Sequence, residues 1–411
     1  MSRLDELIAE LCPDGVELVP LWSVTIWDKK FNSVDRKKQP KVINYPYLLA
    51  ADLFSLQVEH GDVFLLSTGE QTGWTTEELA GDKLREGEVV TMPWGKSRPV
   101  TDCIKYYKGK FVTADNRIMT SANIDVLSNK YLYYWFMSIG GLIDSFYRGS
   151  GIKHPDMAKV LELQIPVPPL PVQQEIVRIL DYFTELTAEL TAELTARKKQ
   201  YEYYRHLLMV PEYDWTAYRI ADVCELQLGK MLDASKNKGK PMPYLANANV
   251  RWGTFDLSGL KTMRFEDDEL EKYALKYGDV MICEGGEPGR CAIWREDNSS
   301  IKFQKALHRA RANSRFLDYR FLFYWLEDAV NSNAIQQLFT GTTIKHLPSS
   351  VLAEIRIWLP DKEKQGKIAD YLDSFADICN NLSSGLPAEI AARQKQYEYY
   401  RDKLLSFPEK G

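Results

Sequence analysis

The sequence lacks long apolar runs and has no surplus of positive charge. No stretch of about eighteen consecutive apolar residues occurs in the chain, so hydropathy excludes a transmembrane span. The opening residues, 1–15, are charged and contain no apolar signal core, and we therefore expect a cytoplasmic protein and not a secreted one. The formal net charge of −5 argues against a chain coated uniformly with cations for binding nucleic acid.

Residues that bind metals are scarce and scattered. The chain has only five histidines, none of them in an HExxH motif or a comparable cluster. Its six cysteines show neither a Cys-x-x-Cys spacing nor a disulfide framework. We interpret the cysteines as reduced thiols, and we predict that the chain holds no metal ion.

Motifs of common nucleotide-binding and DNA-modifying enzymes are also missing. No GxxxxGK(S/T) phosphate loop occurs, and the GSG at 149–151 lacks the third glycine of a dinucleotide site. The strings nearest to the Asn-Pro-Pro-Tyr motif of an amino-methyltransferase, NYPY (44–47) and VPPL (167–170), do not place Asn or Asp beside a double proline. Gln164 stands where a PD…ExK nuclease needs lysine. The sequence therefore favours a protein that is not itself an enzyme.

One long stretch, Val172 to Met209, predicts a continuous amphipathic helix. It contains no Gly or Pro, is rich in good helix formers, and is flanked by Pro171 and Pro211. Apolar residues recur three or four positions apart, which places one apolar stripe along the helix. At 1.5 Å per residue the helix would span roughly 57 Å, too long for one local core to bury its stripe. We therefore expect a second long helix as its partner.

An internal repeat supplies that partner. Residues 196–208 read ARKKQYEYYRHLL, and residues 392–404 read ARQKQYEYYRDKL. ILDYF at 179–183 is likewise echoed by YLDSF at 371–375. Because the copies lie about half a chain length apart, they indicate a duplicated architecture. The YxYYR pattern in each copy is most simply packing between helices, with docking of a partner protein as an additional role.

The segments between the helices repeat in the same order. Each GDV run predicts a strand followed by a glycine loop, whose glycines either form a turn or let the backbone approach DNA closely. Each IKH string is either a scaffold turn or a loop that contacts phosphate. The corresponding strings are YLYYWF (131–136) and FLFYWL (321–326), GSGIKH (149–154) and GTTIKH (341–346), and GDVFLLSTGEQTG (61–73) and GDVMICEGGEPG (278–289).

Positive charge is concentrated in a few stretches. IKFQKALHRARANSR (301–315) carries five Lys or Arg, one His and no acid. A local basic surface on an acidic molecule fits contact with DNA, and the alternative is a solvated face. The candidate DNA-binding residues are Gln71, Thr72, Lys105, Arg117, Arg148, Lys153, His154, Arg290, Lys302, Lys305, Arg309, Arg311, Lys345 and His346.

A tandem tetrapeptide, TAELTAEL at 187–194, lies in the middle of the first long helix. Four residues advance a helix by about 6 Å. Since duplex DNA rises about 3.4 Å per base pair, one unit would change the reach between flanking domains by about one to two base pairs. The alternative is slippage in the gene without consequence. The residues assigned to spacing or partner docking are Thr187, Leu190, Thr191, Leu194, Tyr201, Tyr204, Tyr397 and Tyr400.

The final helical stretch, 361–407, parallels the central helix but contains two helix breakers. Gly385 and Pro387 lie in the string SSGLP, and we expect them to kink or interrupt the helix. The overall plan predicted from the sequence is therefore domain, helix, domain, helix.

This arrangement resembles the specificity (S) subunit of type I restriction-modification enzymes over essentially the full chain. The resemblance rests on the two-domain repeat, the IPVPPLPVQQEIVRILD entry (165–181) to the central helix, the TAEL units, and the twin RKKQYEYYR and RQKQYEYYR endings. TAEL copies followed by that ending resemble the type IC branch in particular.

The resemblance implies an α+β fold of two tandem pseudo-repeated α/β target recognition domains, separated by two long helices packed as an antiparallel coiled coil. The implied divisions are an N-terminal target recognition domain (1–170), a central conserved helix with TAEL repeats (171–210), a C-terminal target recognition domain (211–360) and a C-terminal conserved helix (361–411).

The resemblance also implies a non-catalytic DNA reader. Each domain would recognise one half of a bipartite, asymmetric target, while the helices would set the spacer and dock partners. The implied partners are double-stranded DNA, two methyltransferase subunits and motor-nuclease subunits, with no membrane. S-adenosylmethionine, ATP and Mg would be bound by the partner subunits, and no cofactor by this chain.

Two other classes of function remain open from the sequence. A diverged DNA-modifying enzyme with an unrecognised active site would turn over labelled cofactor without partners. A coiled-coil adaptor with no DNA role would show no salt-dependent DNA binding, even with methyltransferase partners present.

Overall fold

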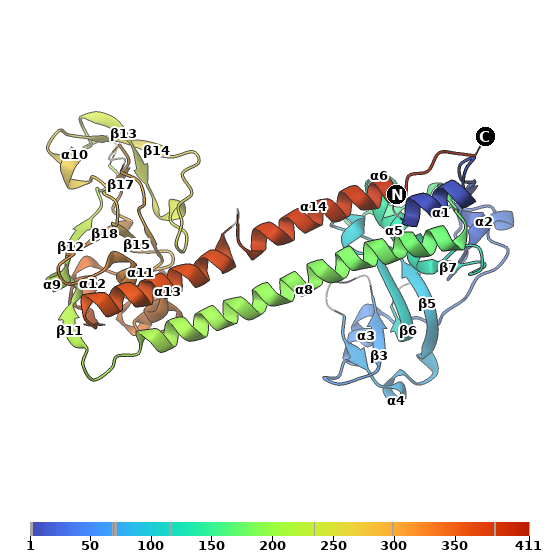
Figure 1. The fold of residues 1–411 in the computed structure, drawn as a ribbon, viewed down its shortest axis with the longest axis horizontal. Coiled ribbons are helices and arrows are strands. Elements are labelled where there is room, and N and C mark those ends of the chain that lie inside the picture. Colours follow the sequence, from blue (N-terminus) through green and yellow to red (C-terminus); the bar gives the residue numbers. More distant parts are fainter. Residues whose placement is uncertain are drawn as a thin grey trace. The chain divides into compact units, whose positions relative to one another are not determined.

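The chain divides into two compact units by its internal contacts. A computed structural model describes residues 3–67, 69, 72–114, 117–233, 235–297, 300–381 and 384–410 (Figure 1). Unit 1 contains Met1–Leu190 and Ile390–Gly411, and unit 2 contains Thr191–Glu389. Each unit therefore combines a globular part with pieces of the long helices. Within the described ranges, no helix is long and apolar enough to cross a lipid bilayer.

Unit 1 is built on a mixed six-stranded sheet in the order β2-β7-β5-β6-β3-β4. In its middle, β5 (Arg85–Thr91) pairs antiparallel with both β6 (Lys105–Thr113) and β7 (Ile118–Ser121). β3 (Val63–Leu66) runs parallel to β6. The other elements are α1 (Arg3–Leu11), β1 (Leu18–Pro20), α2 (Leu21–Val24), β2 (Thr25–Trp27), α3 (Ala50–Ser55), β4 (Trp74–Thr75), α4 (Glu77–Ala80), α5 (Asn129–Ser138), α6 (Gly140–Ser145), β8 (Tyr147–Arg148), β9 (His154–Pro155), α7 (Met157–Leu161) and β10 (Gln164–Pro166).

Unit 2 contains a four-stranded sheet, β12-β18-β15-β16, and a separate three-stranded sheet, β14-β13-β17. β15 (Val280–Cys283) lies between β18 (Leu307–Ala312) and β16 (Cys291–Ile293), and both pairings are antiparallel. The other elements are β11 (Thr216–Arg219), α9 (Ile220–Val223), β12 (Cys224–Leu228), β13 (Lys240–Leu245), β14 (Lys261–Phe265), α10 (Glu269–Lys272), β17 (Lys302–Phe303), α11 (Tyr319–Asn331), α12 (Ser349–Glu354) and β19 (Arg356–Leu359).

The long helices follow the prediction. α8 (Leu170–Met209) is one unbroken helix of 40 residues, seen in green in Figure 1. The last helical stretch is divided into α13 (Lys362–Asn380) and α14 (Leu386–Leu404), which confirms the predicted interruption. Gly385 fits there because a Cβ atom would lie 2.6 Å from the carbonyl oxygen of Asp377.

Within each unit, α8 packs antiparallel against part of the C-terminal helical stretch. In unit 2, Tyr204 contacts the rings of Tyr371 and Phe375 of α13, with centroids 6.0 Å apart in each case. In unit 1, Phe183 stacks on Tyr400 of α14 at 5.4 Å and an interplanar angle of 17°. The expected α+β class, with tandem duplicated units and long antiparallel helices, is confirmed.

The duplication extends to individual buried hydrogen bonds at the start of α8 and α13. Gln173 of α8 accepts a bond from the backbone N–H of Ser128 at 2.9 Å and donates to the Pro168 carbonyl. Gln365 of α13 accepts from the N–H of Asp318, also at 2.9 Å, and donates to the Pro360 carbonyl. A buried amide that satisfies backbone groups on two elements fixes the angle at which the helix leaves each globular part.

One predicted correspondence, between the two GDV runs, is wrong. β3 follows the first run and lies towards the edge of its sheet, whereas β15 follows the second and lies between two antiparallel partners. The counterpart of β15 is β5, which has the same two antiparallel neighbours. Both β3 and β15 are short apolar strands preceded by a Gly-Asp turn, and this local pattern does not encode a strand's position in the sheet.

Strand register gives the residue-level correspondence between β5 and β15. Val90 lies opposite Met119 in unit 1, and Met281 lies opposite Arg309 in unit 2. The repeat that aligns YLYYWF with FLFYWL also aligns Met119 with Arg309. Val90 therefore corresponds to Met281, and the loops that follow β5 and β15 are equivalent.

The two chain ends meet in unit 1. The N–H of Val16 donates to the Pro408 carbonyl at 3.0 Å, and the N–H of Lys410 donates to the Val16 carbonyl at 3.1 Å. Leu405 is 5% exposed and belongs to the same hydrophobic core as α1 and α5. The C-terminal segment is therefore an integral part of unit 1.

Candidate nucleic-acid interface

The IKH turn of unit 1, formed by Ile152, Lys153 and His154, lies on the molecular surface. All three side chains are exposed. β8 pairs antiparallel with β9, and this pairing sets the exposed Arg148 directly opposite His154. The structure thus brings three of the predicted DNA-binding residues together in one hairpin.

A second loop, 92–98, is fixed against this turn. It follows β5, and we call it the strand-end loop of unit 1. The backbones of Lys96 and Lys153 exchange two hydrogen bonds, at 3.1 and 3.3 Å. The Nδ1 atom of His154 lies 3.0 Å from the carbonyl oxygen of Trp94, and the two rings are in contact with centroids 4.7 Å apart. The IKH turn therefore positions the loop backbone directly.

The strand-end loop is also held from the interior. The hydroxyl of Tyr147 donates to the Pro93 carbonyl at 2.6 Å. The Nζ atom of Lys96 forms an ion pair with Asp144, whose carboxylate also accepts the N–H of Val100 at 3.0 Å. Such a loop is preorganised, because little conformational entropy remains to be lost when a ligand binds.

Trp94 is the most prominent side chain of this loop, and sequence reasoning did not single it out. Its side chain is 47% exposed. Arg117, only 2% exposed, lies with its Cζ atom 3.4 Å from the Trp94 ring centroid and 5.2 Å from that of Phe31. Nearby Asp28 is buried, which raises its pKa, while the charges of Lys29 and Arg117 lower it. A buried cation thus supports the exposed indole through a cation–π contact.

The IKH turn of unit 2, formed by Ile344, Lys345 and His346, is built in the same way. All three side chains are exposed. His346 pairs with Gly285 in the strand-end loop of unit 2, residues 284–290. A Cβ atom at Gly285 would lie 2.9 Å from the Nδ1 atom of His346, so the ring lies against bare glycine backbone.

Arg290 anchors the strand-end loop of unit 2. Its guanidinium donates to the Glu287 carboxylate at 2.6 Å and to the Asn247 carbonyl at 3.1 Å. The Asn247 amide in turn donates to the carbonyl of Gly285, and Trp252 donates to Glu287 at 2.8 Å. Arg290 is therefore partly used in holding the loop that supports His346.

Two further predicted residues of unit 1, Thr72 and Lys105, lie outside the hairpin that carries the IKH turn. Gln71 lies outside the described residues. Thr72 is partly buried just before β4. Lys105 starts β6, and its Nζ atom donates to the Gly69 carbonyl at 2.6 Å.

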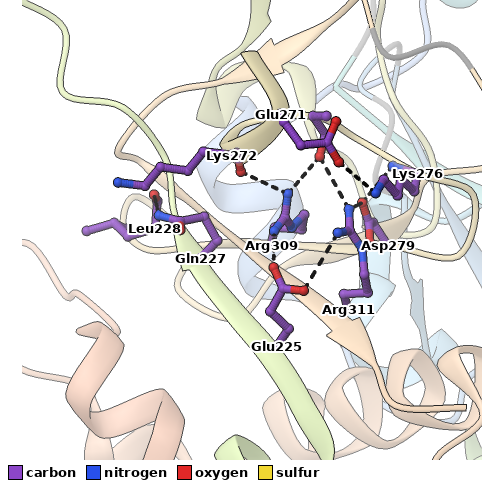
Figure 2. Close-up of polar contacts among 10 residues, drawn as sticks. Glu225, Gln227, Leu228, Glu271, Lys272, Lys276, Asp279, Arg309 and Arg311 are labelled. Atoms are coloured by element: carbon purple, nitrogen blue, oxygen red, sulfur yellow. Dashed lines mark hydrogen bonds and ion pairs between the residues drawn. The ribbon is translucent and has the colours of Figure 1, made fainter. Parts of the chain in front are cut away.

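Two predicted arginines of unit 2 form a polar network in the scaffold (Figure 2). Arg309 is 2% exposed and donates to the carboxylate of Glu225 and to the Ala274 carbonyl, the latter at 2.7 Å. Arg311 forms a bidentate ion pair with the fully buried Asp279, donating from Nε to Oδ1 at 2.7 Å and from Nη2 to Oδ2 at 2.8 Å. These bonds fasten the 271–279 segment to β18, so in this conformation they occupy donors that DNA contact would require.

Lys302 and Lys305 differ sharply in exposure. Lys302 on β17 is 3% exposed, and burial lowers its pKa. Lys305 is exposed, and its backbone N–H donates to the Lys230 carbonyl at 2.8 Å. Of the basic stretch 301–315, Lys305 is the predicted residue that faces solvent most fully.

The helix residues assigned to spacing or docking also differ in their surroundings. Tyr201 is buried and donates to Glu327, to which Arg205 is also paired at 3.2 Å. Leu194 packs on the core of unit 2, while Thr191 is exposed. The others are Thr187, Leu190, Tyr204 and Tyr397, which are partly buried, and Tyr400, which is exposed.

No constellation for metal binding occurs in the part of the chain that the structure describes. No three His, Cys, Asp or Glu side chains lie close enough together there to hold a metal ion. All six cysteines are buried free thiols, and burial raises the pKa of Cys224 to about 12. Thiols with raised pKa values are poor nucleophiles at neutral pH.

Fold and surface together define a class: a duplicated α+β protein whose two units present equivalent cationic turns and share long antiparallel helices. The chain belongs to the family of the type I restriction modification DNA specificity domain, whose model matches residues 39–197 and 212–392. Membership confirms the predicted family and its specificity-subunit role, as opposed to that of a catalytic subunit. The type IC branch stays a prediction.

Individual relatives agree with this assignment. The chain is 31% identical over 339 residues to a protein of Haemophilus influenzae named as a type I restriction enzyme specificity subunit, covering 78% of this chain and 83% of the relative. The type I S subunit of M. genitalium has a similar fold, with a TM-score of 0.55, 15% identity, and coverage of 95% and 96% of the two chains. A chain from a study of complex assembly in the type I system has a TM-score of 0.56, 16% identity, and coverage of 96% and 98%.

Proposed function

We propose that each unit reads one half of a bipartite, asymmetric sequence in double-stranded DNA. The observation that carries this proposal is the repetition of the exposed IKH turn on equivalent strand-end loops. Lys153 and Lys345 supply one positive charge each, and His154 and His346 lie beside them. Such residues contact phosphates and fix the register of a protein on the duplex. Among the other predicted contacts, the exposed Arg148 and Lys305 are retained.

The proposed partners are two methyltransferase subunits, with motor-nuclease subunits joining them. Aromatic side chains support docking along the helices: Tyr203 and Tyr399 are 64% and 61% exposed. Beside α8 in unit 2 lies a cleft of about 1030 Å³, lined by Tyr201, Arg205 and Phe323 among others. Exposed tyrosine is typical of residues that dominate protein interfaces.

In this proposal the chemistry belongs to the partners. S-adenosylmethionine, ATP and Mg are bound by the methyltransferase and motor-nuclease subunits, and this chain supplies sequence recognition in the cytoplasm. The TAEL units then set the unspecified gap between the half-sites.

The direct test is to map methylated adenines in cells carrying the methyltransferase partner, with and without this chain. The expected result is a bipartite motif that appears only when the chain is present. Lys345→Ala should then weaken binding about equally across sequences and reduce the salt slope by about one. Methylation that is independent of the chain, or cofactor turnover by the chain alone, would contradict the proposal.

A further inference from the structure

The contacts with the two IKH turns place different residues at one position of the duplicated loops. Gly95 lies against the ring of His154 as Gly285 lies against the ring of His346, so Trp94 corresponds to Glu284. Unit 1 therefore carries an indole where unit 2 has a carboxylate.

The supporting residue differs between the units as well. The Met92 N–H donates to the Arg117 carbonyl at 3.0 Å, whereas in unit 2 the Glu284 N–H donates to the carbonyl of Ala306, beside Leu307, at 2.9 Å. Leu307 is fully buried and apolar, so unit 2 has neither the indole nor the cation beneath it. The Trp94–Arg117 pair is thus a property of unit 1 alone and not of the shared scaffold.

The position of Trp94 is enforced on several sides. His154 contacts both its carbonyl oxygen and its ring, and Arg117 covers the ring at 3.4 Å. Yet Trp94 is 47% exposed, and its partner His154 is adjoined by two exposed cations, Lys153 in sequence and Arg148 across the β8–β9 pairing. A large aromatic side chain that is held rigidly and left half exposed is typical of a binding residue, because its contact area is gained at little cost in entropy.

We propose that Trp94 is a specificity-determining residue of unit 1, and that it contacts the C5-methyl group of a thymine in the major groove. This inference rests on the proposed function. Arg117 is 2% exposed, so its polar atoms do not reach a base edge, and the indole is what the loop offers. The thymine methyl is the apolar group that base edges present in the grooves of a duplex, which leaves it as the complementary feature.

The test uses the full chain assembled with its methyltransferase partner and a duplex that contains the mapped target. Each thymine of the half-site is replaced in turn by deoxyuridine, which removes only the methyl group. Replacement of the thymine that contacts Trp94 should weaken binding by about fourfold, which corresponds to the free energy of burying one methyl-sized group. With Trp94→Ala, binding should be weaker on the thymine duplex, and the same replacement should have no further effect.

Matched variants separate this role from a structural one. Trp74 is similarly exposed, at 43%, but lies on β4 at the sheet edge, and Trp74→Ala should keep the full response to deoxyuridine. Trp94→Phe retains an aromatic ring and should retain part of that response. Thermal melting of each variant shows whether unit 1 is intact, and the Phe variant provides the answer if the Ala variant does not fold.

Two outcomes would overturn the inference. If Trp94→Ala responds to deoxyuridine as strongly as the unaltered chain, another residue contacts the methyl group. If the unaltered chain responds to no replacement, the indole does not contact a thymine methyl. Failure of the proposed function is different and recognisable, since the unaltered complex would then bind no sequence in preference to others.

Discussion

At the scale of single residues, Asp279 stabilises unit 2 through a buried ion pair. It is fully buried, pairs with Arg311 through both oxygens, and also accepts the backbone N–H of Lys276 at 2.7 Å. Asp279→Asn removes the charge that compensates a partly buried arginine, and should lower the free energy of unfolding by about 3 kcal/mol. Chemical denaturation of the full chain measures this loss. Arg219→Ala, at an exposed pair with Asp222, should change stability little.

The buried residue His308 should make the stability of the folded chain depend on pH. It is 1% exposed, with Nε2 lying 2.8 Å from the Leu347 carbonyl oxygen and Nδ1 lying 3.3 Å from the Ser349 hydroxyl. Burial lowers the pKa of His308 below its usual value of 6.5, while the Leu347 bond and the charge of Glu284 raise it. The unfolded chain therefore binds a proton more readily than the folded chain.

The sign of the effect follows from this difference. At a pH above the pKa that His308 has in the unfolded chain, its imidazole is neutral in both the folded and the unfolded state. Stability therefore falls as the pH drops below about 6.5, because protonation of His308 favours the unfolded chain. His308→Gln should reduce that fall, as seen in melting temperatures between pH 7 and pH 5. Equal pH profiles for the variant and the unaltered chain would exclude His308 as a cause.

At the scale of elements, two glycines of the C-terminal helical stretch should respond oppositely to the same change. A Cβ atom at Gly385 would lie 2.6 to 2.9 Å from three carbonyl oxygens, whereas one at Gly366 in α13 would meet nothing within 4 Å. Gly385→Ala should destabilise the chain by about 1–3 kcal/mol through overpacking. Gly366→Ala should stabilise it by up to about 1 kcal/mol, because alanine is the better helix former. Denaturant unfolding compares the two directly.

The elements also show why some features could be predicted from the sequence and others could not. α8 can be predicted from its composition, its apolar spacing and its flanking prolines, because all of these are local features of the sequence. The IKH turns could be recognised because they occur twice. Trp94 has no counterpart in unit 2 and lies in a loop with no periodic pattern. Its ring is supported by Arg117, which is distant in sequence and reaches Trp94 only because β5 pairs with β7.

The basic stretch 301–315 shows a different limit of sequence reasoning. Its positive charge is visible in the sequence, but the carboxylates that pair with it are not adjacent. Glu225 and Asp279 reach Arg309 and Arg311 from other strands and turns, and only the folded chain brings them together. The charge pattern therefore identifies the positively charged residues but does not show which of them are exposed to solvent.

At the scale of the whole molecule, the TAEL units predict a measurable change in the DNA target. Deleting 187–190 removes about 6 Å of helix, or about one to two base pairs of reach. The methylated motif should keep both half-sites and lose that much of the gap between them. Mapping methylated adenines for the deletion variant tests this. Unchanged spacing, or altered half-sites, would show that the repeat does not set the gap.

The hydrogen bonds between Val16 and the 408–410 segment have a consequence for biosynthesis. Unit 2 is one uninterrupted stretch of polypeptide, so it can fold as soon as the ribosome has released it. Unit 1 needs residues from both sides of unit 2 in the sequence, so although its synthesis begins first it can be completed only after that of unit 2. Ribosome stalling or a nonsense codon directly after unit 2 would thus yield a chain with a folded unit 2 and an incomplete unit 1.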